Sequence, residues 1–300
     1  MYNNINISID RHRIKFDKYF KHFMYKNLQK NELSKAMLYG TVNGGKRIRP
    51  YLISTFSKFV KLPEKNYLQL SAAVECIHSY SLIHDDLPCM DDDDYRRGKL
   101  SVHKKFNEAQ AILAGDSLHD IAFEILSGDR IHKNDKIKIK LIKLLSSTVG
   151  LKGLAGGQSL DLCFENKKIN KSNILNMYNL KTAALFRFCC QAPFIMSNQN
   201  IKNKNFAKKY GEIFGLIFQI IDDYIDETGN YKKIGKTPGK DKKRGKSTIL
   251  QHINKNDIIE ILGPPSTSGL NLSSLSAKTL WLRSSLQTTP GVPKRSCETV

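Results

Sequence analysis

The spacing of apolar residues constrains the fold of this 300-residue chain more than any other feature. Almost everywhere before residue 263, apolar side chains recur at steps of three and four, the period of a helix that buries one face. Runs that alternate polar and apolar residues are scarce, and there is no strand–helix–strand rhythm or internal repeat. The sequence therefore predicts an all-α fold in one large helical domain. Helices are expected over residues 14–39, 49–59, 70–84, 108–127, 136–149, 174–193 and 210–224.

Residues 263–300 differ in composition from the rest of the chain. They contain no Ile, one acid, four of the nine prolines, the sole tryptophan, and 13 Ser and Thr among 38 residues. Such a shift is typical of a segment that does not continue a helical domain. We expect the helical domain to span 1–262 and the atypical tail to be disordered or to arise from a changed reading frame. The only helical spacing in the tail covers 270–286.

Two clusters of aspartate stand out in a chain that is otherwise rich in lysine. The first, residues 85–94, carries six aspartates, and the second, residues 222–226, carries three. Grouped carboxylates repel one another unless a cation neutralises them. Carboxylates that leave room for phosphate oxygens suit Mg²⁺, and basic residues that could hold a diphosphate follow each cluster. The sequence therefore predicts an enzyme that acts on phosphorylated substrates.

The first cluster follows an expected helix. His78 lies two turns before Asp85, roughly 10 Å along one face, a plausible gap between two subsites. Pro88 should end the helix and let Asp91 fold back toward Asp85. The last two aspartates of the cluster are expected to be ordinary charged loop residues. An EF-hand is excluded because the loop lacks its central Gly and distal Glu.

The second cluster lies on a helix. Asp222 and Asp226 are four residues apart and so share one face. Gly215 and Gln219 extend that face into a polar stripe. The alternative is an ordinary solvated face, which in this chain would more often be rich in lysine.

Residues 44–50, GGKRIRP, form a glycine-led basic turn that enters a helix. Backbone N–H groups at the helix start, together with Lys46 and Arg49, would bind an anion. The alternative is a capped loop with exposed cations.

A lysine-rich loop follows the second cluster, with Lys236, Lys240 and Lys246 as candidate phosphate contacts or as solvated charges. A Walker A P-loop is excluded, since five residues rather than four separate Gly239 from Gly245 and no strand precedes them.

The net charge of +20 follows largely from a general enrichment in lysine. Basic and aromatic residues do not interleave along one face, so nucleic acid is not an expected partner. None of the six cysteines forms a CxxC pair, which fits a reducing compartment. The first 15 residues have no apolar core like that of a secretory signal, and no run is long enough to span a bilayer. We expect a cytoplasmic protein with no membrane insertion.

Taken together, the motifs resemble the trans-prenyl diphosphate synthase family, and within it the short-chain bacterial farnesyl diphosphate synthases. They occur in order over roughly residues 40–250, and so many independent motifs make the resemblance specific. The matching stretches are GGKRIRP (44–50), ECIHSYSLIHDDLPCMDDDDYRRG (75–98), AILAGD (111–116), GGQSLDL (156–162), KTAALFR (181–187) and FQIIDDYID with GKTPGKDKKRGKST (218–248).

The resemblance implies a helical fold around a central active-site cavity, in a homodimer. The implied reaction joins an allylic diphosphate to isopentenyl diphosphate with more than one Mg²⁺ ion. Asp85, Asp91 and Asp222 would bind the metal, and Asp86 and Asp226 would support them.

The resemblance also assigns the substrate contacts. The allylic diphosphate would meet Arg96, Lys181 and Lys236, and the isopentenyl diphosphate would meet Lys46, Arg49, His78 and Arg97. Thr182 and Gln219 would lie near the developing carbocation. The diphosphate leaves as Mg²⁺, Arg and Lys stabilise its charge, so no protein nucleophile is required.

The implied product is farnesyl diphosphate, with 15 carbons. Tyr80, five residues before Asp85, would block the floor of the pocket, and Pro88-Cys89 between the aspartates is similar to the farnesyl-length type. One departure concerns the carboxyl-terminal part, where the family's terminal helices are lost after about residue 262.

Other interpretations stay open at this point. A geranylgeranyl diphosphate synthase would differ in product length, and a non-catalytic partner subunit would keep the fold without turnover. A terpene cyclase would share the first aspartate cluster but would not need the basic turn at 44–49.

Overall fold

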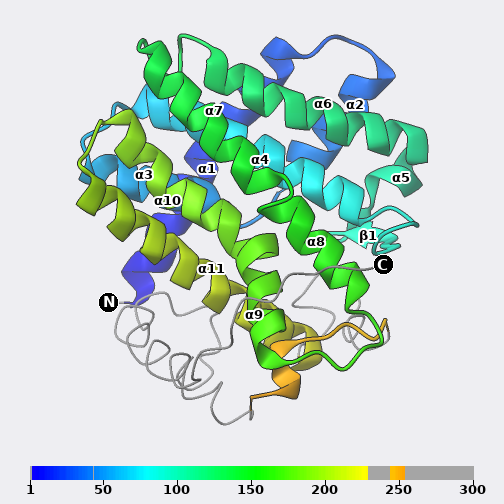
Figure 1. The fold of residues 1–300 in the computed structure, drawn as a ribbon. Coiled ribbons are helices and arrows are strands. Elements are labelled where there is room, and N and C mark those ends of the chain that lie inside the picture. The colour runs from blue at the N-terminus through cyan, green and yellow to red at the C-terminus, as the bar shows by residue number, and fades with distance from the viewer. Residues whose placement is uncertain (1, 43, 229–243, 254–300) are drawn as a thin grey trace.

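The computed structural model describes residues 2–42, 44–228 and 244–253, and these form one helical domain (Figure 1). The expected all-α class is therefore confirmed. Within the described ranges the only sheet is a small antiparallel hairpin of β1 (Tyr95–Arg96) and β2 (Lys99–Leu100). The helices are α1 (Tyr2–Asn27), α2 (Glu32–Val42), α3 (Ile48–Phe59), α4 (Glu64–Asp85), α5 (Val102–Lys105), α6 (Glu108–Ser127), α7 (Asp135–Val149), α8 (Leu154–Cys163), α9 (Lys171–Tyr178), the π-helix η1 (Asn179–Ala183), α10 (Ala184–Met196), α11 (Ile201–Thr228) and the 3₁₀-helix η2 (Ile249–Gln251).

Two helices that were expected to be continuous are interrupted in the structure. The stretch 14–39 is divided between α1 and α2, because the Asn31 side chain accepts a hydrogen bond from the Ser34 N–H at 2.8 Å and so starts a new helix. The stretch 174–193 contains the π-helix η1 between α9 and α10. The expected helix 210–224 was too short, because α11 begins at Ile201, and the remaining expected helices lie within two turns of the observed bounds. The tail over 263–300, and the boundary at 262, lie outside the described residues.

Helix α4 is the centre of the molecule. Its buried side chains point in every direction around the helix, from Leu70 and Ala73 to Cys76 and Ile77, all 0% exposed. A helix buried on all sides needs neighbours on all sides, and α4 has α6, α3 and α2 against it (Figure 1). Its carboxyl end is therefore held rigidly, and that end carries the first aspartates.

Helices α10 and α11 form the other large packing pair. Phe186 on α10 contacts Phe214 and Phe218 on α11, with ring centroids 5.2 and 5.1 Å apart. A separate apolar cluster joins α9, the second half of α11 and η2 around Tyr178, Ile220 and Ile249. This cluster places residues 244–253 beside the helix that carries the second group of aspartates.

No helix in the described ranges has the length and apolar character that a bilayer crossing requires.

Candidate active site

The first aspartate cluster folds as expected. Helix α4 ends at Asp85, and the chain then turns so that the Asp91 N–H donates to the Asp85 carbonyl at 2.7 Å. Pro88 lies in the turn between them and is exposed. The return of Asp91 to the end of α4 is thus confirmed, and it brings two carboxylates to one edge of the helix.

Asp86 has a different environment. It is 2% exposed, and the Arg96 Nε donates to its carboxylate at 2.9 Å. Arg96 also pairs with Asp93 at 3.2 Å. The expectation that Asp93 is an ordinary charged loop residue was wrong, because the side chain is 6% exposed and shares Arg96 with Asp86. These two acids hold the arginine in place.

Alternating acidic and basic side chains connect Asp91 to Lys181 of η1. The Lys246 Nζ lies 3.0 Å from Asp91 and 3.4 Å from Asp161, and the Lys181 Nζ donates to Asp161 at 2.5 Å. Arg244 adds a further cation 3.7 Å from Asp91. Lys246 of the 244–253 segment therefore lies beside the first aspartates, and Lys181 of η1 is connected to it through Asp161 of α8.

Lys181 and Thr182 both belong to the π-helix η1. Two glycines allow neighbouring helices to approach its backbone closely. A Cβ on Gly157 of α8 would lie 2.1 Å from the Lys181 nitrogen, and one on Gly215 of α11 would lie 2.5 Å from the Ala183 Cα. π-Helical turns often occur at functional sites, and this one fixes the direction of two candidate site residues.

The π-helix also connects to the second aspartate cluster. The Thr182 hydroxyl donates to Gln219 at 2.5 Å, and Gln219 donates to Asp223 at 2.8 Å. Tyr178 donates its hydroxyl hydrogen to Asp223 and accepts the Ile249 N–H at 2.9 Å. Thr182 and Gln219 are thus hydrogen-bonded to each other, and Gln219 connects them to the second cluster.

The remaining aspartates of α11 divide by exposure. Asp222 is exposed, whereas Asp226 is 4% exposed. The polar stripe expected for this helix is therefore only partly solvated: Gly215 packs on η1 and Gln219 bonds across to it. Asp222 is close enough that its charge acts on the Arg49 guanidinium, which links α11 to the basic turn.

The basic turn forms a second group of cations. The Arg49 guanidinium lies 4.5 Å from the centroid of the Phe186 ring and donates to the His78 Nε2 at 3.3 Å. Arg97 donates to the Gly44 carbonyl and packs against Gly45. Lys46 is exposed at the same turn. Four residues expected to hold one diphosphate, Lys46, Arg49, His78 and Arg97, therefore gather where α3, α4 and the β1–β2 turn meet.

Burial and neighbouring charges raise the pKa of some of these groups and lower that of others. Burial, and then the charge of Arg49, lowers the pKa of His78 well below its usual value, so His78 is a neutral acceptor. Burial raises the pKa of Asp85 to about 6 and that of Asp86 to about 6. Burial has the same tendency at Asp91, but the positive charges of Lys246 and Lys181 outweigh it and the pKa is lowered.

The carboxylates at the end of α4 fit a divalent cation. Asp85 is a desolvated acid whose charge burial disfavours, and Asp91 lies beside it. An oxygen-only donor set with this much negative charge suits Mg²⁺, which keeps several other positions for water or phosphate oxygens. Asp85 and Asp91 are therefore candidate metal ligands, whereas Asp86 pairs with Arg96.

Tyr80 lies one turn before the aspartates on α4. Its ring packs edge-on against His84, 5.5 Å away, and against His119 of α6, 5.2 Å away. Tyr80 therefore packs between His84 of its own helix and His119 of α6, one turn before the aspartates.

Some residues of the site were missed from the sequence, and one expected residue is not described. Lys236 lies within 229–243, outside the described residues. Three residues that were not expected in the site form hydrogen bonds with expected site residues or with each other: Asp161, Asp223 and Tyr178. Asp161 lies inside the GGQSLDL motif, and that was the available signal. Nothing local to Tyr178 marks it.

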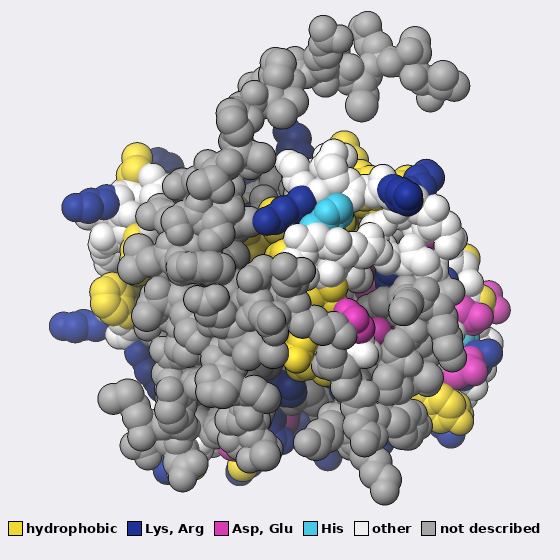
Figure 2. Space-filling model, turned by 90° about the horizontal axis from the view of Figure 1, so that it is seen from below, with side chains coloured by type: hydrophobic (Ala, Val, Ile, Leu, Met, Phe, Trp, Pro, Cys, Tyr) yellow, Lys and Arg dark blue, Asp and Glu magenta, His cyan; other side chains and the backbone are white. Residues whose placement is uncertain are grey.

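The face below α9 in Figure 1 is shown in Figure 2. In the described part of this face, acidic side chains lie next to hydrophobic ones, and Lys and Arg lie both beside a histidine and around the rim.

The protein is all-helical, its first aspartate cluster pairs with Lys246, and the π-helix connects to the second cluster through Thr182 and Gln219. Together with the separate basic group at Arg49, these features define a class of enzymes that act on diphosphates. The chain belongs to the polyprenyl synthetase family, whose sequence model matches residues 30–258.

Known relatives agree with this family. The chain is 41% identical to the farnesyl diphosphate synthase of Escherichia coli over 222 residues, which is 73% of this chain and 74% of that protein. Its structure is similar to that of an FPP/GFPP synthase from Zymomonas mobilis, with a TM-score of 0.76 and 34% identity over 97% of this chain and 95% of that one. It is also similar to a Helicobacter pylori geranyltransferase complexed with magnesium and isoprenyl diphosphate, with a TM-score of 0.72 and 29% identity over 93% and 97% of the two chains.

Proposed function

We propose that this protein is a Mg²⁺-dependent prenyltransferase that condenses dimethylallyl or geranyl diphosphate with isopentenyl diphosphate to form farnesyl diphosphate. One observation carries the proposal. There are two separate basic groups. The first, Lys181 and Lys246, pairs with Asp91 and Asp161, and the second, Arg49 and Arg97, gathers at the basic turn. Two diphosphates with different roles need two such groups.

The first group would hold the allylic diphosphate. Mg²⁺ ions on Asp85, Asp91 and Asp222 would neutralise charge that develops on the leaving diphosphate. Lys181 and Lys246 would exchange their present carboxylate partners for phosphate oxygens, a short movement because the lysines already lie next to Asp91. Arg96 and Lys236 are proposed to contact the same diphosphate, and Asp86 and Asp226 to support the metal-binding acids.

The second group would hold isopentenyl diphosphate. Arg49 is pre-oriented by Phe186 and by His78, and Arg97 by the Gly44 carbonyl. Preoriented donors bind an anion without losing much side-chain freedom. Because His78 is neutral, it can orient the guanidinium without adding a charge that competes for the substrate.

Thr182 and Gln219 would face the carbocation. Their hydrogen bond presents oxygen dipoles rather than a nucleophilic charge between the two substrate groups. The isopentenyl double bond then attacks the allylic carbon, and the proton lost afterwards passes to the departed diphosphate. An apolar, water-free pocket keeps the cation from being hydrolysed.

The name of the Escherichia coli relative favours a product of 15 carbons, and Tyr80 at the expected floor supports it. The main alternative is a longer product, because the Zymomonas mobilis protein is described as forming either of two lengths. A non-catalytic subunit is less favoured, since the aspartates of both clusters are present together with their lysine partners.

We also propose a homodimer in the cytoplasm. Ile112 and Leu113 of α6 are 44% and 48% exposed on the outer side of the helix that covers α4. In the proposed dimer these two side chains would pack against the second copy. Sedimentation of the purified protein would test the assembly, and a species of the monomer's mass at assay concentrations would contradict it.

The reaction is tested by incubating the protein with dimethylallyl and isopentenyl diphosphates, with Mg²⁺ and with EDTA, and resolving the dephosphorylated products. We expect a C15 product that requires the metal. A longer product would keep the reaction class and overturn the assigned length. No product from a folded protein under any metal condition would favour the non-catalytic subunit.

A further inference from the structure

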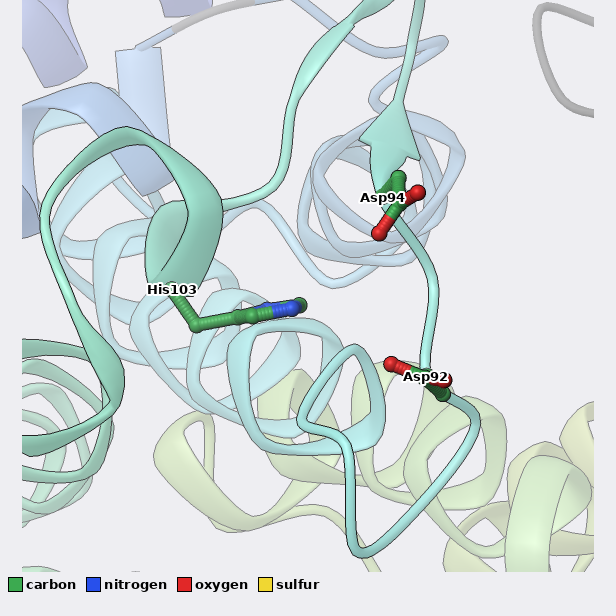
Figure 3. A group of neighbouring side chains, drawn as sticks. All are labelled: Asp92, Asp94 and His103. Atoms are coloured by element: carbon green, nitrogen blue, oxygen red, sulfur yellow. The ribbon is translucent and has the colours of Figure 1, made fainter.

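A second group of possible metal ligands lies outside the diphosphate sites. Asp92 and Asp94 follow Asp91 in the loop after α4, and His103 lies on the short helix α5. One ligand atom from each of the three side chains lies within 4.8 Å of the others. Figure 3 shows the tip of the His103 ring pointing into the space between the two carboxylates.

His103 is the observation that distinguishes this group from an ordinary acidic loop. The side chain is 7% exposed, and its Nε2 is buried with no hydrogen-bond partner in the part of the chain that the structure describes. Its Nδ1 lies 3.1 Å from the Ser101 hydroxyl, which fixes the orientation of the ring. A buried nitrogen without a partner is unfavourable, and a ring fixed at one nitrogen by a hydrogen bond is the usual state of a metal-binding histidine.

The loop points these acids away from the proposed active site. Asp91 faces Lys246 and Arg244, whereas Asp92 has a left-handed backbone with φ of 46°, which reverses the chain direction between them. Asp94 pairs instead with Lys104 of α5 at 2.9 Å. The two acids beyond Asp91 thus belong to the outer side of the loop, next to α5.

We propose that Asp92, Asp94 and His103 bind a transition-metal dication of the Zn²⁺ class, separate from the Mg²⁺ ions of catalysis. An imidazole with two carboxylates favours Zn²⁺ over Mg²⁺, because Mg²⁺ prefers oxygen ligands alone. The site is open to solvent, and water would complete the coordination.

The ligands need a small movement to close on one ion. Two atoms bonded to the same Zn²⁺ at roughly 2.0–2.2 Å lie at most about 4.4 Å apart. Asp92 and Asp94 are both exposed, so their side chains can rotate toward the fixed histidine. The ion would then connect the loop that carries Asp91 and Arg96 to α5.

Lys104 is the competitor for this ion. Its ammonium group neutralises Asp94 in the metal-free protein. Removing that charge should therefore raise the affinity for the dication, although it removes an ion pair. If Asp92, Asp94 and His103 had only a structural role, replacing Lys104 would not change the affinity of the protein for the dication.

The test uses the full chain, with Zn²⁺ as the probe and excess Mg²⁺ present to occupy the catalytic aspartates. Titration calorimetry should show one Zn²⁺ equivalent that Mg²⁺ does not displace, and Zn²⁺ should raise the melting temperature. His103→Gln and Asp92→Asn should each weaken that binding roughly 10- to 100-fold. Lys104→Met should strengthen it roughly 2- to 5-fold.

Two matched controls separate this site from general binding. His22→Gln removes an exposed histidine of α1, and Lys105→Met removes the exposed lysine next to Lys104; both should leave the affinity unchanged. Equal Zn²⁺ affinity in wild type and His103→Gln would overturn the proposal, as would complete displacement of Zn²⁺ by Mg²⁺. Lys104→Met, an exposed substitution, keeps the test decisive if the His103 variant fails to fold.

Discussion

At the scale of single residues, the site depends on acids whose role is to hold cations. Asp161 accepts from Lys181 and lies near Lys246, and neither contact is local in sequence. Asp161 is 5% exposed. It therefore holds the ammonium groups of Lys181 and Lys246 in place before the substrate binds. Asp161 therefore acts as a positioning residue and not as a catalytic one.

We expect Asp161→Asn to lower kcat roughly 10- to 100-fold, the usual effect of removing the group that orients a site residue. The neutral amide no longer fixes Lys181 and Lys246, which then lie further from the leaving group. Steady-state kinetics would measure the change, and Asp161→Glu should restore part of it. Asp135→Asn, an exposed acid at the start of α7, is the matched control. Equal kcat in Asp161→Asn and wild type would show that the lysines do not need this partner.

Tyr80 is predicted to set the product length. Tyr80→Ala removes the ring that lies between His84 and His119, and the growing chain should extend past this position to products longer than 15 carbons. Chromatography of the products would measure the shift. Tyr25→Ala, at an exposed position of α1, should leave the product unchanged. If Tyr80→Ala still stops at 15 carbons, the floor is elsewhere.

At the scale of elements, close backbone contacts decide where the site residues point. The π-helix η1 is held between α8 and α11, and both contacts occur at glycines. A side chain at either position would separate the helices and turn Lys181 and Thr182 away from the aspartates. The GGQSLDL stretch is therefore a packing requirement as well as a site motif.

Gly157→Ala should destabilise the protein by roughly 1–3 kcal/mol, since its Cβ would overlap the Lys181 backbone. Urea unfolding would measure the loss, and activity should fall further than stability does. Gly128→Ala is the matched control, because a Cβ there meets nothing nearer than 3.6 Å. A loss of stability as large in Gly128→Ala would show that glycine flexibility, and not close approach, is the cause.

Arg47 lies in the basic turn at the start of α3 and connects α3 to α4 and α1. It is 4% exposed, pairs with Glu75 of α4 at 2.5 Å and Asp17 of α1 at 2.7 Å, and has φ of 49°. Its place beside Arg49 in the sequence suggests substrate binding, but its contacts are structural.

Arg47→Met should therefore destabilise the protein by roughly 3–5 kcal/mol, because it leaves Glu75 buried without a partner. Lys35→Met, which breaks an exposed pair with Glu32, should change stability by only about 0–1 kcal/mol. Both values come from denaturant unfolding. Comparable losses in the two variants would contradict the buried role of Arg47.

At the scale of the whole molecule, buried ionisable groups make stability depend on pH. Burial lowers the pKa of His12, which packs against Phe16 and Tyr51, from about 6.5 to about 4. The unfolded chain then binds a proton between these values while the folded chain does not. Stability therefore rises with pH through this window and is lost as pH falls from about 6.5 toward 4.

His12→Gln should reduce the stability that is lost as pH falls from about 6.5 toward 4. The measurement is the difference between variant and wild type in the free energy of unfolding at pH 4.5 and at pH 7, which cancels the opposite tendency of Asp85 and Asp86. The exposed His22→Gln should leave the profile unchanged. A wild-type profile in His12→Gln would mean that the buried imidazole does not control this range.

The residues that could hold metal and diphosphate were indicated by the resemblance of the motifs to a known family. The sequence by itself determined the helical class and the return of Asp91 to Asp85. These follow from short-range rules: the 3.6-residue period, the effect of proline on a helix, and the charge of neighbouring aspartates. Only the tertiary structure decided that Asp161 and Tyr178 connect the two clusters, that Asp93 is buried on Arg96, and that a π-helix carries Lys181. Tyr178 and Asp223 are 45 positions apart, and Asp161 and Lys181 are 20 apart. The burial of Asp93 depends on how its loop folds, and the π-helix depends on how closely two helices approach at a glycine, so no local pattern in the chain encodes these contacts.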